Sequence, residues 1–96
     1  MEIVYKDALE VEFQRMNIPY SREKEYTVKY KNVILPHKFN ADFVVYDKII
    51  LEAKAAKAIH EKHQAQALNY LSVSSEKLAI IVNFGEMKLN YQRFVK

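Results

Sequence analysis

The stretch Asn40–Lys54, NADFVVYDKIILEAK, decides the fold. It predicts a β-hairpin, because the two apolar runs 43–45 and 49–51 are rich in β-branched and aromatic residues and a short polar segment separates them. Side chains alternate across a strand, so Glu52 and Lys54 share one face. The open end of the hairpin therefore carries an aspartate on one strand and Glu-x-Lys on the other.

The length of the turn decides where the acidic side chains lie. With a three-residue turn, 46–48, Val45 pairs with Ile49 and Asp42 lies directly opposite Glu52, with the Cβ atoms roughly 4.5–5.5 Å apart. A two-residue turn shifts the register by one residue and sends the aspartate to the other face, unless a bulge compensates for the shift. The longer turn would place two carboxylates and the neighbouring lysine ammonium on one patch.

Such a patch suits metal-assisted hydrolysis. Two close carboxylates repel each other, and one takes up a proton unless a cation lies between them. Mg²⁺ or Mn²⁺ prefers oxygen ligands and keeps several waters, and Lys54 could orient or deprotonate a water that attacks a phosphodiester. The alternative is an exposed strand end with a salt bridge of little energetic value. Spacing alone does not separate the two interpretations.

Composition limits the classes of protein that this chain can belong to. The 96 residues predict a single domain, 1–96, and half of them are hydrophobic, which suffices for one core. Cysteine is absent, so no disulfide framework or thiolate zinc site is possible, and a cytoplasmic location is expected. No apolar run approaches the roughly 18 residues of a membrane span, and no signal peptide is evident. The net charge of +3 is compatible with nucleic acid.

The chain before the hairpin predicts a helix and short strands. Residues 2–16 form an amphipathic helix that Pro19 ends, and 26–30 form a half-buried strand. The segment 21–25 is polar and charged, and Pro36-His37-Lys38 breaks the short apolar run 33–35. The predicted core face of the helix consists of Val4, Tyr5, Ala8, Leu9, Phe13 and Met16.

The chain after the hairpin predicts a helix over 59–72 and two strands. The helix has an apolar stripe that His63 and Gln66 interrupt, either as structural hydrogen-bonding groups or as a face directed at the carboxylates. The continuous apolar run 78–82 indicates a strand covered on both faces. Gly85, the one glycine, is expected to provide freedom at a turn, and a final short strand follows. The order predicts an α/β fold with a mixed sheet and a helix on each face, or both helices on one face.

These residues together resemble the PD-(D/E)XK nuclease superfamily, and within it the GxxExxY family of small bacterial proteins. The resemblance covers essentially the whole chain and implies a restriction-endonuclease-like αβββαβ core. It rests on Glu2-Ile3-Val4-Tyr5 with Ala8-Leu9, Leu35-Pro36-His37-Lys38-Phe39 with Ala41-Asp42, Ile49-Ile50-Leu51-Glu52-Ala53-Lys54-Ala55, His63-Gln64-Ala65-Gln66 with Leu68-Asn69-Tyr70-Leu71, Val82-Asn83-Phe84-Gly85, and Arg93-Phe94-Val95.

The resemblance also implies roles for individual residues. Asp42 and Glu52 match the superfamily's metal ligands, and Lys54 matches the lysine that positions or activates water. Glu2 matches a helix glutamate that approaches the metal in related resolvases, and Gln66 matches a helix glutamine beside the site. Further residues expected to line the site or contact nucleic acid are Tyr5, His63, Lys38, Lys57 and Lys62. The implied cofactor is Mg²⁺ or Mn²⁺, and the implied partners are DNA, branched or otherwise structured, and a second copy of the chain.

Two departures from the family pattern stand out. Family members usually carry another helix and a Leu-Gly-x-Gly segment before the motif glutamate, whereas here Met1 directly precedes Glu2, so that helix is expected to be absent. Many members also have arginine where this chain has Asn40. A glutamate at a fraying terminus is a weaker ligand.

Three functions follow as hypotheses. The first is a metal-dependent DNA nuclease. The second is a non-catalytic nucleic-acid-binding module that uses Lys38, Lys57, Lys62 and Arg22, with salt-dependent binding and no metal requirement. The third is a protein-interaction domain of a larger system. Clustered carboxylates favour the nuclease over the binding module, because they repel phosphate unless a cation is present.

Overall fold

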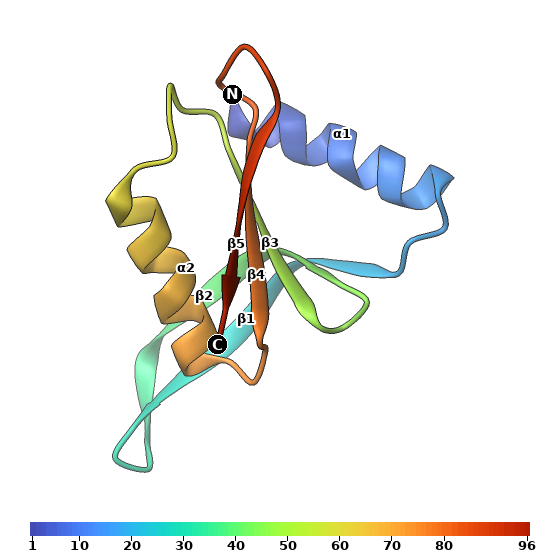
Figure 1. Cartoon of the computed structure of the whole chain (residues 1–96). Coiled ribbons are helices and arrows are strands. Elements are labelled where there is room, and N and C mark those ends of the chain that lie inside the picture. The colour runs from blue at the N-terminus through green and yellow to red at the C-terminus, as the bar shows by residue number, and fades with distance from the viewer.

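Two helices and five strands make up the chain, and the computed structural model describes all of residues 1–96 (Figure 1). The strands form one mixed sheet in the order β1-β2-β3-β4-β5, in which only β3 and β4 run parallel. The α/β fold and mixed sheet predicted from the sequence are therefore confirmed. In chain order the elements are α1 (Glu2–Arg15), β1 (Tyr20–Tyr30), β2 (Val33–Val45), β3 (Ile49–Lys54), α2 (Glu61–Val73), β4 (Leu78–Asn83) and β5 (Asn90–Val95).

The two helices cover opposite faces of the sheet, which decides between the two predicted arrangements (Figure 1). Ala67 and Leu71 of α2 are buried in a core cluster with Ile50 of β3 and Ile81 of β4. On the other face, Phe13 of α1 lies in a second cluster with residues of β2 and β3. Burial of these apolar side chains is the main favourable term that fixes both helices on the sheet.

The helix α1 is held by few apolar contacts. Phe13 is its one buried residue and Leu9 is half-buried, whereas Val4 and Tyr5 of the predicted core face are exposed. Polar contacts supplement the packing, because Arg22 of β1 forms ion pairs with α1 carboxylates.

Neither helix has the length and apolarity that a membrane crossing requires.

The central hairpin has the three-residue turn. Val45 pairs with Ile49, and Tyr46 and Asp47 adopt positive φ angles within the turn. The backbone N–H of Tyr46 donates to the carbonyl of Pro19, which ties the turn to the segment that enters β1. The register that brings the acidic residues to the same end of the hairpin is therefore the one observed.

The first two strands are longer than predicted. The strand that was predicted over 26–30 begins at Tyr20, so the polar segment 21–25 belongs to β1. Pairing with β2 supplies its backbone hydrogen bonds, and its side chains alternate between half-buried and exposed. Pro36 does not end β2 either. The register shifts between Thr27 and Lys29, and Pro36 lies in the extra length of β2 opposite that shift, where its missing N–H is not needed.

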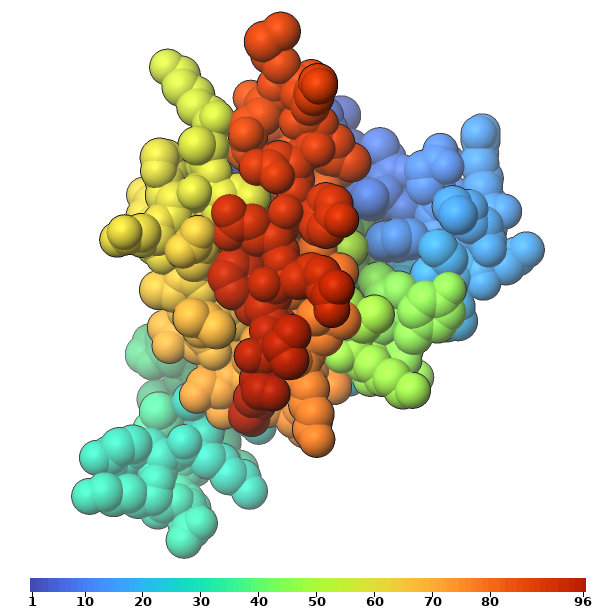
Figure 2. Space-filling model, viewed as in Figure 1, coloured from blue at the N-terminus to red at the C-terminus, as the bar shows by residue number.

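Both strands switch faces at Glu23 and Asp42. Tyr20 and Arg22 contact α1, whereas Tyr26 belongs to the α2 side, although all three have even numbers and a regular strand would place them on one face. The register is unchanged across this point, and Glu23 has a φ of 56°. Beyond the switch, the segment 24–41 forms a hairpin, here called the arm, whose base packs against α2 and whose tip extends away from the rest of the molecule (Figures 1 and 2).

Gly85 serves a different purpose from the one expected. It has no positive φ angle. A Cβ atom at this position would lie 2.3 Å from the backbone carbonyl oxygen of Ala56, so glycine is needed for close approach of two backbone segments. Asn83, which is fully buried, joins the same segments: its side chain accepts from the Ala56 N–H and donates to the Ala56 carbonyl.

Candidate functional site

The β2–β3 ladder ends at Phe43 and Leu51, one residue before the two carboxylates. Beyond that point the side chains replace backbone pairing. The N–H of Asp42 donates to Glu52 Oε2 over 3.1 Å, and the N–H of Ala53 donates to Asp42 Oδ2 over 2.8 Å. The two carboxylates therefore lie together in the fork where the strands separate, and each satisfies a backbone donor of the opposite strand.

The carboxyl group of Glu52 is buried in surroundings that disfavour its charged form. Its residue is 6% exposed, and its Oε1 atom is buried without a hydrogen-bond partner. Burial, followed by the hydrogen bond with Asp42 and the negative charge of Asp42, raises the pKa of Glu52 to about 9. Glu52 therefore holds a proton at neutral pH unless a cation replaces it.

Lys6 is a member of the site that the sequence reasoning missed. Its Nζ lies 3.0 Å from Asp42 Oδ1 and 3.5 Å from Glu23 Oε1, so it bridges the two residues at which the strands switch faces. The Lys6 and Asp42 side chains are 16% and 14% exposed. In the sequence, Lys6 could be placed near the site only because it follows Tyr5 on the predicted helix. A lysine at such a position is ordinarily expected to be exposed to solvent. The ammonium neutralises the carboxylate that would otherwise be free to bind a metal ion.

Lys54 ends β3 on the face that Glu52 occupies. Its positive charge acts on Glu52 and on His63. The Phe84 N–H donates to the Lys54 carbonyl, and Tyr5 of α1 stacks on Phe84 at 4.7 Å. The fold thus brings the start of α1 to the end of β3 that carries this lysine.

Glu2 lies at the first residue of α1 and is exposed. It is close enough to His63 to raise that pKa slightly, against larger opposing effects. No group of three or more His, Asp or Glu side chains gathers to hold a metal, so the structure does not join Glu2 to Asp42 and Glu52.

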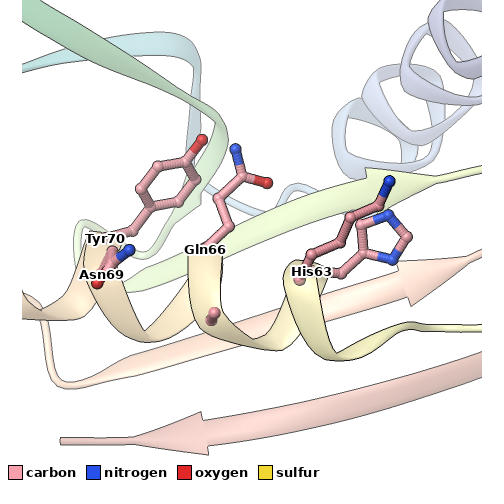
Figure 3. Close-up of a pocket in the computed structure, with 6 residues that line it drawn as sticks. His63, Gln66, Asn69 and Tyr70 are labelled. Atoms are coloured by element: carbon pink, nitrogen blue, oxygen red, sulfur yellow. The ribbon is translucent and has the colours of Figure 1, made fainter.

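One face of α2 carries polar side chains beside β3 (Figure 3). A cleft of about 450 Å³ is lined by Lys62, His63, Ala65, Gln66, Asn69 and Tyr70. The side chains of His63, Gln66 and Tyr70 project from the helix in the same direction, and Gln66 is exposed. Burial, with smaller effects of the nearby carboxylates, raises the pKa of Tyr70 to about 12. The cleft therefore borders the carboxylate pair without containing it.

His63 has a structural contact as well as a place in the cleft. Its Nδ1 accepts a hydrogen bond from the backbone N–H of His60 over 3.1 Å, which caps the start of α2. Burial and then the charge of Lys54 lower the pKa of His63. The ring is therefore neutral near pH 7, with its proton on Nε2. The side chain of Gln66 makes no hydrogen bond within the protein.

The expected nucleic-acid contacts are dispersed. Lys57 is exposed in the segment between β3 and α2, and Lys62 lines the cleft. Lys38 lies on the arm, with its Nζ 3.3 Å from a Glu25 carboxylate oxygen. Arg22 is held by Asp7 at 2.8 Å and Glu10 at 2.9 Å on α1. Of these four basic residues, only Lys57 and Lys62 therefore lie where β3 ends and α2 begins, the region that Tyr5 and His63 also occupy.

The carboxylate pair fits a hard divalent cation. The pair offers oxygen donors, which Mg²⁺ and Mn²⁺ prefer, and the unpartnered Glu52 Oε1 is a buried acceptor that a cation would satisfy. The positive charge of a bound cation would also favour the ionised form of Glu52, which would then release its proton.

Three comparisons place the chain among known proteins. A family model described as the PD-(D/E)XK nuclease superfamily matches residues 1–94. A solved structure titled "Crystal structure of SSO0001" shares the fold with a TM-score of 0.76 and 17% sequence identity over 97% of this chain. The match covers 50% of that chain, so the present chain spans half its length. No curated protein matches.

Proposed function

Because this chain belongs to the PD-(D/E)XK nuclease superfamily, we propose that it is a metal-dependent nuclease that cleaves DNA phosphodiester bonds at the fork between β2 and β3. The observation that carries the proposal is the pair of hydrogen-bonded carboxylates, Asp42 and Glu52, with an unpartnered buried oxygen. The fold is restriction-endonuclease-like, and the narrower relationship to the GxxExxY family stays a prediction.

The residues of the fork, and those on the neighbouring face of α2, each have a proposed role. Asp42 and Glu52 would hold Mg²⁺ or Mn²⁺, and the chemistry that such an ion would supply is charge stabilisation for the phosphate and a more acidic water. Lys54 orients the attacking water or takes part in its deprotonation. Gln66 and the Nε2–H of His63, on the neighbouring face of α2, donate hydrogen bonds to the substrate backbone, and Lys57 and Lys62 attract its phosphates.

The start of α1 has a supporting role in this proposal. Glu2 would be a further ligand only if the first turn of α1 moved toward the carboxylate pair, and Tyr5 holds that helix through its stack on Phe84. A divalent cation at Asp42 would displace the Lys6 ammonium, which could then contact phosphate.

The experiment is metal-dependent cleavage of labelled DNA by matched variants. Asp42→Asn and Glu52→Gln keep an acceptor for the backbone N–H groups but lose the charge, so the fold is retained. We expect each to lower the cleavage rate at least about a hundredfold. Asp47→Asn, in the exposed turn of the hairpin, is the matched control and should cleave at the wild-type rate. Equal cleavage by the wild type and the Asp42→Asn, Glu52→Gln double variant would refute the proposal.

Metal binding gives a second readout that does not depend on cleavage. Calorimetric titration of Mn²⁺ should show binding to the wild type and none to Asp42→Asn. Because Glu52 must lose its proton, binding at pH 7 should release close to one proton, seen as a dependence of the measured heat on the ionisation enthalpy of the buffer. Binding without proton release would contradict the assignment of Glu52 as a ligand.

A non-catalytic nucleic-acid-binding module is the second candidate function. The observation that favours it is the Lys6–Asp42 ion pair, which neutralises the fork with a cation of the chain itself. On this alternative, DNA binding is salt-dependent and unaffected by Mn²⁺, and the Mn²⁺ titration shows no heat for any variant.

We also propose that the protein works as a homodimer. Ile3, Val4 and Val11 of α1 are exposed and apolar, and such a patch suits a second copy of the chain. Light scattering should give twice the monomer mass, and Val4→Lys with Val11→Lys should return the protein to a monomer.

A further inference from the structure

The proposed catalytic site between β2 and β3 assigns no role to the tip of the arm formed by residues 24–41. It contains Lys24, Lys29, Lys31 and Lys38 against the one carboxylate of Glu25. Its net charge of +3 equals that of the whole chain, so the charges in the rest of the molecule cancel. The excess positive charge of this protein is therefore concentrated on one projecting hairpin (Figure 2).

The tip of the arm, residues 29–34, presents both charge and apolar surface. Tyr30 and Val33 are each 60% exposed and Ile34 is 58% exposed. The Lys31 ammonium lies 5.5 Å from the centre of the Tyr30 ring. The tip has no acidic residue, so nothing within it neutralises Lys29 and Lys31.

Both ends of the arm have defined local structure. Tyr26 and Phe39, opposite each other on its two strands, stack at 5.0 Å, and Phe39 stacks on Tyr70 of α2 at 4.3 Å. At the far end Lys31 and Asn32 both have positive φ angles, as the tight two-residue turns of β-hairpins require. A three-ring stack therefore fixes the base of the arm and a tight turn closes its tip, with the shift in register between Thr27 and Lys29 lying between them.

We propose that the arm is a β-ribbon that enters the major groove of double-stranded DNA, with Lys29 and Lys31 on the phosphates and Tyr30, Val33 and Ile34 on sugars and base methyl groups. The major groove is about 12 Å wide and admits a two-stranded β-ribbon. A convex ribbon suits a duplex groove, whereas single strands are bound in concave basic channels. The inference rests on the proposed function only in taking DNA as the ligand, and it does not require cleavage.

The test is fluorescence anisotropy of a labelled duplex, and of one of its strands alone, with full-length protein in EDTA. Lys29→Gln with Lys31→Gln removes two tip charges, and Lys48→Gln with Lys88→Gln removes two exposed charges from other turns. The tip variant should bind duplex about tenfold more weakly and lower the slope of log affinity against log salt by about 2. The control pair should bind as the wild type does.

Two further measurements make the result decisive. Replacing residues 29–34 by Asn-Gly shortens the ribbon, and it should abolish the preference for duplex over single strand if circular dichroism shows the fold retained. The glutamine variants alter only exposed side chains and keep the test valid if this shortened chain does not fold. Equal loss of duplex and single-strand binding would overturn the groove assignment, as would a tip variant that binds duplex normally but loses self-association in light scattering.

Failure of the arm and failure of the nuclease proposal give different results. If the fork is not catalytic, the tip variant still loses duplex binding. If the arm does not bind DNA, the tip variant binds like the control pair while Asp42→Asn still loses Mn²⁺.

Discussion

Glu52 is the residue whose protonation links the site to stability. Its pKa in the folded protein, about 9, lies above the ordinary value of a glutamate, so the folded metal-free protein binds a proton that the unfolded chain releases above about pH 4.5. The free energy of unfolding should therefore fall as pH rises between about 4.5 and 9, by up to about 1.4 kcal/mol per pH unit. Urea unfolding at pH 7 and pH 8.5 measures this slope. Glu52→Gln should flatten it, and a slope that survives the substitution would assign it to another group.

Lys6 competes with any cation at Asp42. Lys6→Met removes the ammonium but keeps the length of the side chain, so Mn²⁺ no longer displaces an ion pair at 3.0 Å. We expect Mn²⁺ affinity to rise several-fold, and the metal-free protein to lose about 1 kcal/mol because Asp42 is left without its partner. Lys48→Met in the exposed turn serves as the control. Weaker Mn²⁺ binding by Lys6→Met would show that Lys6 supports the metal ion rather than competing with it.

At the scale of elements, the turn after β4 and the segment after β3 are locked by close backbone packing. Gly85→Ala would place a Cβ atom 2.3 Å from the Ala56 oxygen, and the backbone on both sides would have to move. The free energy of unfolding should fall by about 1–3 kcal/mol, the usual effect of overpacking. Thermal unfolding measures the loss, with the fully exposed Met87→Ala in the same turn as a control that should be neutral. An unchanged melting temperature for Gly85→Ala would show that the two segments separate easily.

The periodic spacing of apolar residues predicted those helices and strands whose buried face is set by their own sequence. The central hairpin and the buried face of α2 follow from the alternating and helical spacing of apolar residues around Val45, Ile50 and Leu71, and the mixed sheet follows from the order of the elements. The spacing leaves the length of the turn at 46–48 open between two and three residues, and the structure decides it. The face switch at Glu23 and Asp42 did not follow, because a positive φ at a glutamate has no signature in the sequence. Polar strand residues such as those at 21–25 were missed because their pairing depends on a partner strand rather than on their own composition.

Members of the site were predicted unequally for a related reason. The family pattern and the hairpin register located Asp42, Glu52 and Lys54, since all three belong to one local structure. Lys6 comes from a helix far away in the chain, and its approach to Asp42 depends on how α1 docks on the sheet. The angle at which a helix packs on a sheet cannot be derived from the spacing of residues in the sequence. A lysine on an amphipathic helix that contacts the sheet therefore cannot be distinguished from one that points into solvent.

At the scale of the whole molecule, stability is distributed unevenly between the two faces. The α2 face has a cluster of seven buried residues, whereas α1 contributes only Phe13 to a cluster of three. Amide hydrogens of α1 should therefore exchange through a lower free energy of opening than those of β3, β4 and α2. Hydrogen-exchange mass spectrometry measures this difference, and Phe13→Ala should widen it. Uniform protection across both helices would show that the polar contacts of Arg22 hold α1 as firmly as an apolar core.

The face switch gives the arm and the candidate site a shared piece of backbone. Glu23 and Asp42, where both strands change faces, set the direction in which the arm leaves the sheet, and Lys6 of α1 contacts both side chains. The angle of the arm and the orientation of the Asp42 carboxylate are therefore not geometrically independent of each other.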